Sequence, residues 1–366
     1  MLGFAQTSHG RKWTYAPDNL DELRRASNAR GAAHVSAGPQ LEGEPVEPLS
    51  PEEELALLRK FATHDLPLIC AAERVRASAR ARERIRALAC VFLVRVYAAR
   101  SMMEVCGGGV LDPRVVLCTC VLVAAKVEEA KEVDAAALEA ASQVSRALIL
   151  AVEPDVLAAL DHDLCAHSPI GALDGLLHAL AEDGGGVQYV KAEPGAPPAE
   201  TASVQRAHAH ARLRAACVGL ALGAGARADG LLRYSPQQLA LAAFGACAHT
   251  PDGTALGVAP FLSRRLPGLL VEGAGADERL APVRAAMRDA AAAHGVDEEA
   301  EAARADALYH RLKICHQRAK AASAALAAER AAAGAKRRLD AVEARPAPAD
   351  VDDASAPLAK VRRSSV

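Results

Sequence analysis

One segment constrains the fold of this chain more than any other part of the sequence. Residues 115–125, VVLCTCVLVAA, carry no charge and lie between Arg114 and Lys126. This stretch is well short of the roughly 20 apolar residues that a membrane-spanning helix needs. Asp112-Pro113 is a typical helix start, and the apolar residues that follow cover nearly every side of a helix. The sequence therefore predicts a soluble chain with this helix at the centre of a helical bundle.

The residue composition favours the same architecture. Hydrophobic residues make up 51% of the 366 residues, but the aromatic residues are only five Phe, five Tyr and one Trp. A core built from Ala, Leu and Val packs as close helices more readily than as half-buried strands. We therefore predict an all-α fold and exclude an all-β sandwich.

Charge and cysteine usage exclude several classes of protein. The chain has 43 basic and 45 acidic residues, so no overall electrostatic field favours nucleic acid. Nine cysteines in irregular spacing, without a CxxC pair, favour neither a disulfide framework nor a zinc site, and a reducing compartment fits them best. The first residues lack the apolar stretch of a secretory signal. We expect no metal, no cofactor and no membrane contact.

Helix-start and helix-stop signals divide the chain into predicted helices. In addition to the helix after Asp112-Pro113, the predicted ranges in the first half are 17–30, 50–70, 79–100, 135–152 and 154–165. Further along, RAACVGL resembles the earlier ALACVFL, and Ser235-Pro236 opens a helix as Asp112-Pro113 does. The sequence thus predicts two copies of one helical unit, the second interrupted by an insertion over 182–201. A last long helix opens at Asp297 and fades near Gly334.

One glycine pattern could indicate a nucleotide site. Gly223, Gly225 and Ala228 match the dinucleotide fingerprint G-x-G-x-x-A. Such a site needs a strand before the turn and a helix after it, and the predicted elements contain no strand. We interpret these glycines as a link between two helices.

Neighbouring cysteine and histidine residues could indicate a metal site. They occur at Cys165/His167, Cys247/His249 and Cys315/His316. Residues one or two positions apart on a helix point to different faces, so we expect structural cysteines and histidines at the solvent edge instead. No protein-kinase, P-loop or G-x-S-x-G motif occurs in the sequence, and no catalytic residues are predicted.

Lys126 stands out because it follows the most apolar stretch and precedes Glu128 and Glu129. A buried ammonium group is costly unless it is paired or reaches a partner. The residues alone favour a side chain that extends to solvent at the helix end and caps the last carbonyl groups. Near the N-terminus, the RKWTY segment places Trp13 and Tyr15 beside two cations, and we expect these rings to dock on another surface.

Several segments together resemble the cyclin family, and within it the H type. In chain order they are SHGRKWTYAPDNLDELRRASNAR, LCTCVLVAAKVEE, LDHDLCAHSPI, LLRYSPQQLALAA and LYHRLKICHQRAK. The KVEE segment is typical of cyclins in general, whereas the RKWTY arm and the LKxCH segment indicate the H type. Residues 131–150, 182–213 and 250–300 match poorly.

The resemblance implies two five-helix cyclin boxes without an active site. The implied division is an N-terminal arm and helix over 1–48, cyclin boxes over 49–167 and 168–294, a C-terminal helix over 295–340 and a disordered tail over 341–366. Cyclins bind the αC helix of a kinase and hold it inward, so that the kinase's own Lys–Glu pair and magnesium site are assembled. The chain would then be a non-catalytic regulatory subunit of a cyclin-dependent kinase.

The resemblance also implies which residues contact the kinase. By the match to LCTCVLVAAKVEE, Lys126 would hydrogen-bond backbone carbonyl groups at the kinase αC region. Its family partner is a glutamate that falls on Glu153, although Pro154 should place Glu153 at a helix start. The further contacts predicted are Val127, Glu128, Trp13 and Tyr15.

Partners and location follow from the same resemblance. In the family, the kinase, the cyclin and a RING-containing assembly factor form a trimer that phosphorylates cyclin-dependent kinases and, within general transcription factor IIH, the tail of RNA polymerase II. Basic clusters at 336–338 and 360–363 fit nuclear import, and no direct nucleic-acid binding is expected. The alternatives are a C-type transcriptional cyclin, a helical DNA-binding scaffold of the transcription factor IIB type, and an enzyme built on Gly223 and Gly225.

Overall fold

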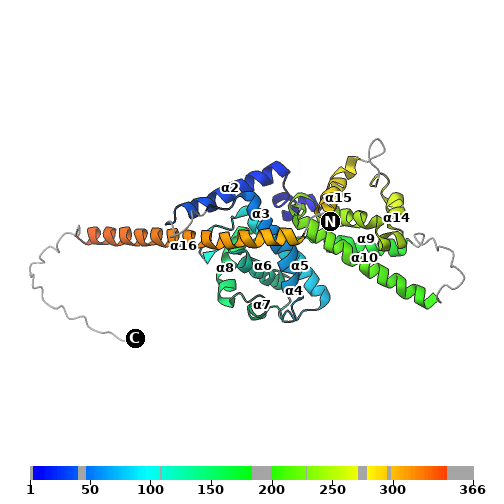
Figure 1. Ribbon diagram of the computed structural model, residues 1–366, viewed down its shortest axis with the longest axis horizontal. Coiled ribbons are helices and arrows are strands. Elements are labelled where there is room, and N and C mark those ends of the chain that lie inside the picture. Colours follow the sequence, from blue (N-terminus) through cyan, green and yellow to red (C-terminus); the bar gives the residue numbers. More distant parts are fainter. Residues whose placement is uncertain are drawn as a thin grey trace, which may run out of the picture. The chain divides into compact units, whose positions relative to one another are not determined.

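The computed structural model describes residues 3–39, 47–107, 109–183, 199–227, 229–270, 278–294 and 298–343 (Figure 1). Residues 1–323 form one compact unit and residues 324–366 form a second. In the second unit, the described part is the end of the last helix, which continues to Glu343, beyond the predicted end near Gly334. Most of the predicted tail over 341–366 and most of the 182–201 insertion lie outside the described residues.

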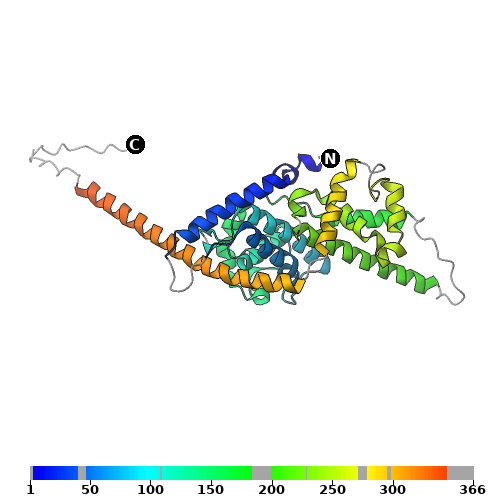
Figure 2. The same ribbon diagram turned by 45° about the horizontal axis from the view of Figure 1, so that its top comes forward.

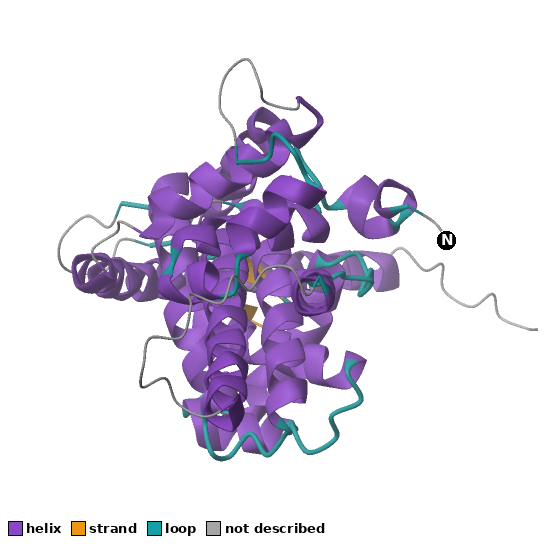
Figure 3. Ribbon diagram, turned by 90° about the vertical axis from the view of Figure 1, so that its right-hand side faces the viewer, coloured by secondary structure: helices purple, strands orange, loops and turns teal. Residues whose placement is uncertain are grey.

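The first unit is helical (Figure 3). Its first half contains α1 (Ser8–Lys12), α2 (Pro17–Ser36), α3 (Pro51–Lys60), α4 (Leu66–Ala71), α5 (Ala79–Ala99), α6 (Pro113–Val127), α7 (Ala135–Ser142) and α8 (Arg146–Ala159). Its second half contains α9 (Pro169–Glu182), α10 (Ala199–Arg227), α11 (Gly230–Arg233), α12 (Pro236–Ala246), α13 (Pro251–Ala255), α14 (Val258–Arg265) and α15 (Ala281–His294), and α16 (Glu298–Glu343) follows. The π-helical turn η2 (Phe61–Asp65) joins α3 to α4, and 3-10 turns are η1 (Phe4–Gln6), η3 (Cys247–His249) and η5 (Glu278–Leu280). Within the described residues, the strands are limited to the hairpin of β1 (Val105–Cys106) and β2 (Gly109–Val110), so the predicted all-α fold is confirmed.

Side-chain caps account for the predicted helix starts. The Ser50 hydroxyl accepts the backbone N–H of Glu53 at 3.3 Å, and the Glu53 carboxylate accepts the backbone N–H of Ser50 at 2.8 Å. Asp112 caps α6 by accepting the backbone N–H of Arg114 at 2.9 Å. A proline occupies the first helical position after both caps. The N–H group that proline lacks would have no partner within the helix at this position, so no hydrogen bond is lost. The predicted helix starts at these two caps are therefore confirmed.

Helix α6 lies at the centre of the first half, as predicted. Every residue from 115 to 125 is at most 9% exposed, and the helix packs against α5 and α8. In the second half, α12 is the corresponding central helix, because it packs against α9, α10 and α15. The box boundaries inferred from the resemblance stay a prediction. Within the described residues, no single helix is long and apolar enough to cross a membrane; α7 and α8 meet that criterion only together, bent by 114°.

The predicted helix break at Pro154 is wrong. The break between α7 and α8 falls at residues 143–145 and not at Pro154. Gln143 ends α7 in the left-handed conformation with φ 60°, and the Ser145 hydroxyl caps α8 by accepting the backbone N–H of Ala147 at 3.3 Å. Pro154 lies inside α8 on its exposed side, where water can satisfy the carbonyl that loses its N–H partner. Glu153 therefore lies within a helix instead of at its start.

Helix α2 extends beyond its predicted end near Arg30 because it packs closely on the first half (Figure 2). The side-chain amide of Asn28 donates to the carbonyl oxygen of Leu49 at 2.8 Å. Gly31 is buried beside Ser101, and a β-carbon on Gly31 would lie 2.6 Å from the β-carbon of Ser101. Only a residue without a side chain lets the two segments approach this closely.

We expect Gly31→Ala to lower the free energy of unfolding by about 1 to 3 kcal/mol, because the added methyl group must displace Ser101. Gly219→Ala is the matched control, since a β-carbon on Gly219, inside α10, would meet no atom within 4 Å. This second substitution should raise stability by up to about 1 kcal/mol. Chemical denaturation followed by circular dichroism measures both changes, and equal effects would contradict the close approach of α2.

Candidate partner-binding site

Lys126 and Glu153 form an ion pair at one end of the helical bundle. Lys126 is the second-last residue of α6, so its side chain leaves the apolar stretch at the helix end and is 55% exposed. Its ammonium group donates to the carboxylate of Glu153 on α8, which is 16% exposed. Because α6 packs against α8, the two side chains meet across that helix interface. The structure thus brings together the pair that the family resemblance implied.

The predicted capping role of Lys126 is wrong. The carbonyl groups at the end of α6 accept backbone N–H groups instead: Glu128 donates to Ala124 at 3.0 Å, and Ala130 donates to Ala125 at 2.9 Å. The ammonium group is therefore available for other partners. An ammonium has three N–H donors, and one of them is directed to Glu153. The exposed position leaves the others open to carbonyl oxygens of a docking protein.

The residues beside Lys126 differ in how far their side chains are exposed to a binding partner. Val127 is 41% exposed although its side chain is apolar. Glu128 is mostly covered, because its carboxylate forms an ion pair with Arg84 at the start of α5. Leu150, which lies three residues before Glu153 on the same face of α8, is 49% exposed. Lys126, Val127, Glu153 and Leu150 together form a surface that we call the α6–α8 face.

Sequence reasoning missed Leu150. An apolar residue at an exposed helical position is the signal that could have identified it. That signal was hidden because the predicted helix break at Pro154 put Leu150 near a helix end, where exposure is ordinary.

Trp13 docks within the chain itself. Its side chain is 3% exposed, the indole N–H donates to the Asp163 carboxylate at 3.2 Å, and the guanidinium of Arg95 lies 4.9 Å from the ring centre. The backbone N–H of Tyr15 donates to the carbonyl oxygen of Leu232, on α11 in the second half, at 2.8 Å. The N-terminal arm, residues 3–16, thus connects the end of the first half to the second. Direct kinase contact by Trp13 and Tyr15 stays a prediction.

A buried ion pair reinforces this connection. The guanidinium of Arg24 on α2 donates to the carboxylate of Asp229, just before α11, at 2.6 Å. The two side chains are 9% and 17% exposed, so little water screens their charges. Helix α2 is therefore held to both halves of the first unit.

Two histidines stack where the arm meets the end of the first half. The rings of His9 and His167 are 5.9 Å apart and nearly parallel, at 9°. The Nδ1 atom of His9 accepts the backbone N–H of His167 at 3.0 Å, while its Nε2 atom is buried without a partner among the described residues. Burial, together with the nearby charge of Arg95, lowers the pKa of His9 to about 3. His9 is therefore neutral at pH 7.

The three cysteine–histidine pairs hold no metal site in the part of the chain that the structure describes. No group of three or more possible ligands is assembled there. Cys247 and Cys315 are buried, as predicted for structural cysteines, whereas Cys165 is exposed. His316 is buried too, contrary to its predicted solvent-edge position, because its Nε2 atom hydrogen-bonds to the carbonyl oxygen of Met102 at 2.8 Å. The predicted edge position is confirmed for the other two histidines, His167 and His249.

The glycine pattern is not a link between helices, and it forms no nucleotide cradle. Gly223 and Gly225 lie inside α10, so the predicted interruption is wrong. A dinucleotide site requires a turn between a strand and a helix N-terminus. A continuous helix at these glycines offers neither this turn nor a helix N-terminus. The alternative of an enzyme built on Gly223 and Gly225 is therefore left without a nucleotide-binding motif.

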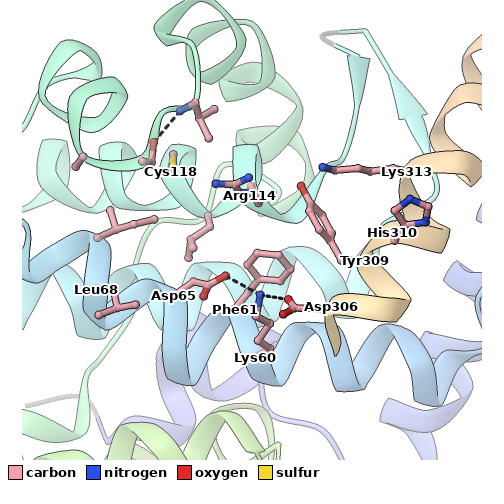
Figure 4. Close-up of a pocket in the computed structure, with 15 residues that line it drawn as sticks. Lys60, Phe61, Asp65, Leu68, Arg114, Cys118, Asp306, Tyr309, His310 and Lys313 are labelled. Carbon is pink, nitrogen blue, oxygen red and sulfur yellow. Dashed lines mark hydrogen bonds and ion pairs between the residues drawn. The ribbon is translucent and has the colours of Figure 1, made fainter. Parts of the chain in front are cut away.

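A separate cavity of about 570 Å³ lies between α16 and the ends of η2, α4, α6 and α7 (Figure 4). Tyr309 packs edge-on against Phe61 with ring centres 5.6 Å apart, and the Lys60 ammonium pairs with Asp306 at 2.9 Å. The other residues that line it are Asp65, Leu68, Ile69, Arg114, Leu117, Cys118, Ala141, Ser142, Val144, His310 and Lys313. Three basic side chains and two acidic ones line it, together with one histidine.

One part of the chain matches a known protein family. Residues 73–165 match the family described as "Cyclin, N-terminal domain". This range runs from just before α5 to just after α8 and contains both Lys126 and Glu153. Residues 73–165 therefore correspond to a cyclin N-terminal domain.

A curated relative with a similar sequence is a cyclin H. Cyclin-H1-1 of Arabidopsis thaliana is 25% identical over 205 residues, which cover 50% of this chain and 56% of that protein. The chain thus matches little more than half the length of this curated relative.

Two solved structures have a similar fold. One chain comes from the CAK complex of Chaetomium thermophilum bound to ATP-gamma-S; it has a TM-score of 0.59 and 19% identity, over 96% of this chain and 98% of that one. A chain of the yeast TFIIK (Kin28/Ccl1/Tfb3) complex has a TM-score of 0.50 and 20% identity, over 78% of this chain and 99% of that one.

We expect mild acid to release the N-terminal arm before the helical core unfolds. The pKa of His9 is lowered in the docked state, so the released arm binds more protons, and docking loses free energy as pH falls below 6.5 toward 3. At pH 5 the loss should be about 2 kcal/mol. Trp13, the single tryptophan, reports release as a red shift of its fluorescence.

His9→Asn is the control for this titration, because asparagine can still accept the backbone N–H of His167 but cannot take up a proton. The red shift between pH 6.5 and 5 should disappear in this variant. The same shift in both proteins would show that another group controls docking of the arm.

Proposed function

We propose that this chain is the regulatory subunit of a cyclin-dependent serine/threonine kinase and has no catalytic activity of its own. The observation that supports this most directly is the Lys126–Glu153 pair, whose exposed lysine lies at the end of the two packed helices in the region that matches the cyclin N-terminal domain. An exposed ion pair contributes only about 0 to 1 kcal/mol to stability. The pair is therefore better explained by recognition of a partner than by the fold.

In the proposed complex, the ammonium group of Lys126 donates to backbone carbonyl groups at the kinase αC region. Glu153 holds the ammonium in place and lowers the conformational entropy lost on binding. Val127 and Leu150 supply apolar surface on either side. Contacts made only with the inward position of αC shift the kinase toward the state in which its Lys–Glu pair and magnesium site are complete.

The other predicted contacts support this face in different ways. Glu128 acts through its ion pair with Arg84, which fixes the end of α6 against α5. Trp13 and Tyr15 act through the arm, which they hold against the junction of the two halves. The arm would thus fix the two halves relative to each other before a kinase binds to both.

The type of complex is proposed from the relatives. Similarity to a cyclin H and to chains of CAK and TFIIK assemblies favours a CDK-activating kinase that also serves in general transcription factor IIH. Its substrates would be cyclin-dependent kinases and the C-terminal domain of RNA polymerase II. A RING-containing assembly factor and the core of transcription factor IIH would be further partners, in the nucleus.

We expect Lys126→Ala to weaken binding of the co-expressed kinase by about 10- to 100-fold, because charge-assisted hydrogen bonds contribute about 1.5 to 3 kcal/mol. Kinase activity on a peptide substrate should fall in parallel at limiting cyclin concentration. Lys131→Ala is the matched control, since Lys131 is also exposed but lies outside the α6–α8 face. Both variants should melt within a few degrees of the wild type by circular dichroism.

A Lys126→Ala protein that unfolds, or that activates the kinase as well as the Lys131→Ala control, would show the lysine to be structural. Identifying the bound kinase by mass spectrometry separates the H type from the C type of cyclin. Phosphoryl transfer by the purified chain alone would contradict the regulatory role.

A further inference from the structure

An unusual concentration of arginine lies around the start of α5. Between residues 74 and 86 the sequence RVRASARARERIR contains six arginines and one glutamate, in a chain whose net charge is −2. Helix α5 begins at Ala79, capped by the Ser78 hydroxyl, which accepts the backbone N–H of Ala81 at 3.2 Å. We call the side chains of Arg74, Arg76, Arg80 and Arg82 the arginine surface. Three of them are exposed and Arg82 is half-buried.

Of the acidic groups near this surface, Glu83 and Glu128 are already engaged by other arginines, and the exposed Glu73, which precedes Arg74, forms no ion pair among the described residues. Glu83 accepts from the guanidinium of Arg214 on α10 at 2.9 Å. Glu128 pairs with Arg84. Within the described residues, the four side chains of the arginine surface make no ion pair or side-chain hydrogen bond. Their positive charge is therefore not neutralised by the chain itself.

Helix stability does not explain these residues. Cations in the first turn of a helix oppose its dipole, and like charges at neighbouring positions repel each other. Each arginine here costs some stability or contributes none. An external anion would remove both costs at once.

The position of the arginine surface indicates what could reach it. Helices α5 and α6 run in opposite directions, since Tyr97 near the end of α5 donates to the carbonyl oxygen of Leu111 just before α6, and Arg84 near the start of α5 pairs with Glu128 just after it. The start of α5 therefore lies at the same end of the bundle as Lys126. A protein seated on the α6–α8 face would bring its own segments beside the arginines.

We propose that the arginine surface binds a phosphorylated segment of a protein in the kinase assembly, through phosphoserine or phosphothreonine. The proposal rests on the proposed function for the identity of the assembly, but the chemistry rests on the arginines. A phosphate group carries about −1.5 to −2 charges at pH 7 and three acceptor oxygens, and the planar guanidinium matches two of these oxygens at once. Two phosphates would neutralise the four unpaired arginines, whereas simple carboxylates would need twice as many residues.

The test measures binding of a short fluorescein-labelled glycine–serine peptide that carries two phosphoserines, by fluorescence anisotropy with the full chain and no kinase. Arg74→Gln/Arg76→Gln/Arg80→Gln should weaken binding by about tenfold or more. The unphosphorylated peptide should not bind, and the wild-type affinity should fall as salt is added. Because Arg74 and Arg76 precede α5, the double variant Arg74→Gln/Arg76→Gln should show part of this loss without any change in the helix.

Arg288→Gln/Arg304→Gln/Arg330→Gln is the matched control, since it removes the same charge from exposed positions on α15 and α16. This control should keep the wild-type affinity. Equal losses in the two triple variants would show that only net charge matters and would overturn the proposal. Tighter binding of a single-stranded oligonucleotide of equal charge would also overturn it, in favour of nucleic acid.

Binding of the phosphopeptide is independent of the kinase contact. Lys126→Ala should bind the phosphopeptide as the wild type does, because Lys126 is not part of the arginine surface. A wild-type chain that binds the phosphopeptide but no kinase would overturn the proposed regulatory role alone. Normal kinase binding without phosphopeptide binding would overturn only the present proposal.

Discussion

The packing of the first half depends on the burial of α6 on all of its sides. Each large apolar side chain that it buries contributes roughly 1.5 to 3 kcal/mol, and α5 and α8 supply the surfaces that cover it. The length of the apolar stretch also fixes where the helix meets solvent. Arg114 and Lys126 mark the two ends, so the core itself determines the position of Lys126. One segment thus sets both the packing of the first half and the place of the lysine for which we propose a binding role.

Much of the fold was predictable because it is encoded locally. The apolar residues of α6, the cap at Asp112 and the capping box at Ser50 each lie within a few consecutive positions. The α7–α8 break was mispredicted because two helix-start signals compete, Ser145 and Pro154. Both fit a helix start in isolation. Packing of α8 against α6 decides between them, and that contact has no local signature.

The candidate site was only partly predictable, for the same reason. Lys126 is conspicuous in the sequence, but its pairing with Glu153 followed from the family resemblance and not from the spacing of the two residues. The hydrogen bond of Trp13 to Asp163 and the ion pair between Arg84 and Glu128 each join positions far apart in the chain. No periodicity within a single segment encodes such contacts. The structure is needed to show that the arm packs on its own chain.

The N-terminal arm also affects how a large partner can bind. The halves of the first unit are joined by the backbone around residues 160–168, and the arm adds a further connection through Asp163 and Leu232. Each added connection restricts hinge bending between the halves. A protein that contacts both halves then loses less rotational freedom on association, and its affinity rises without a single additional contact.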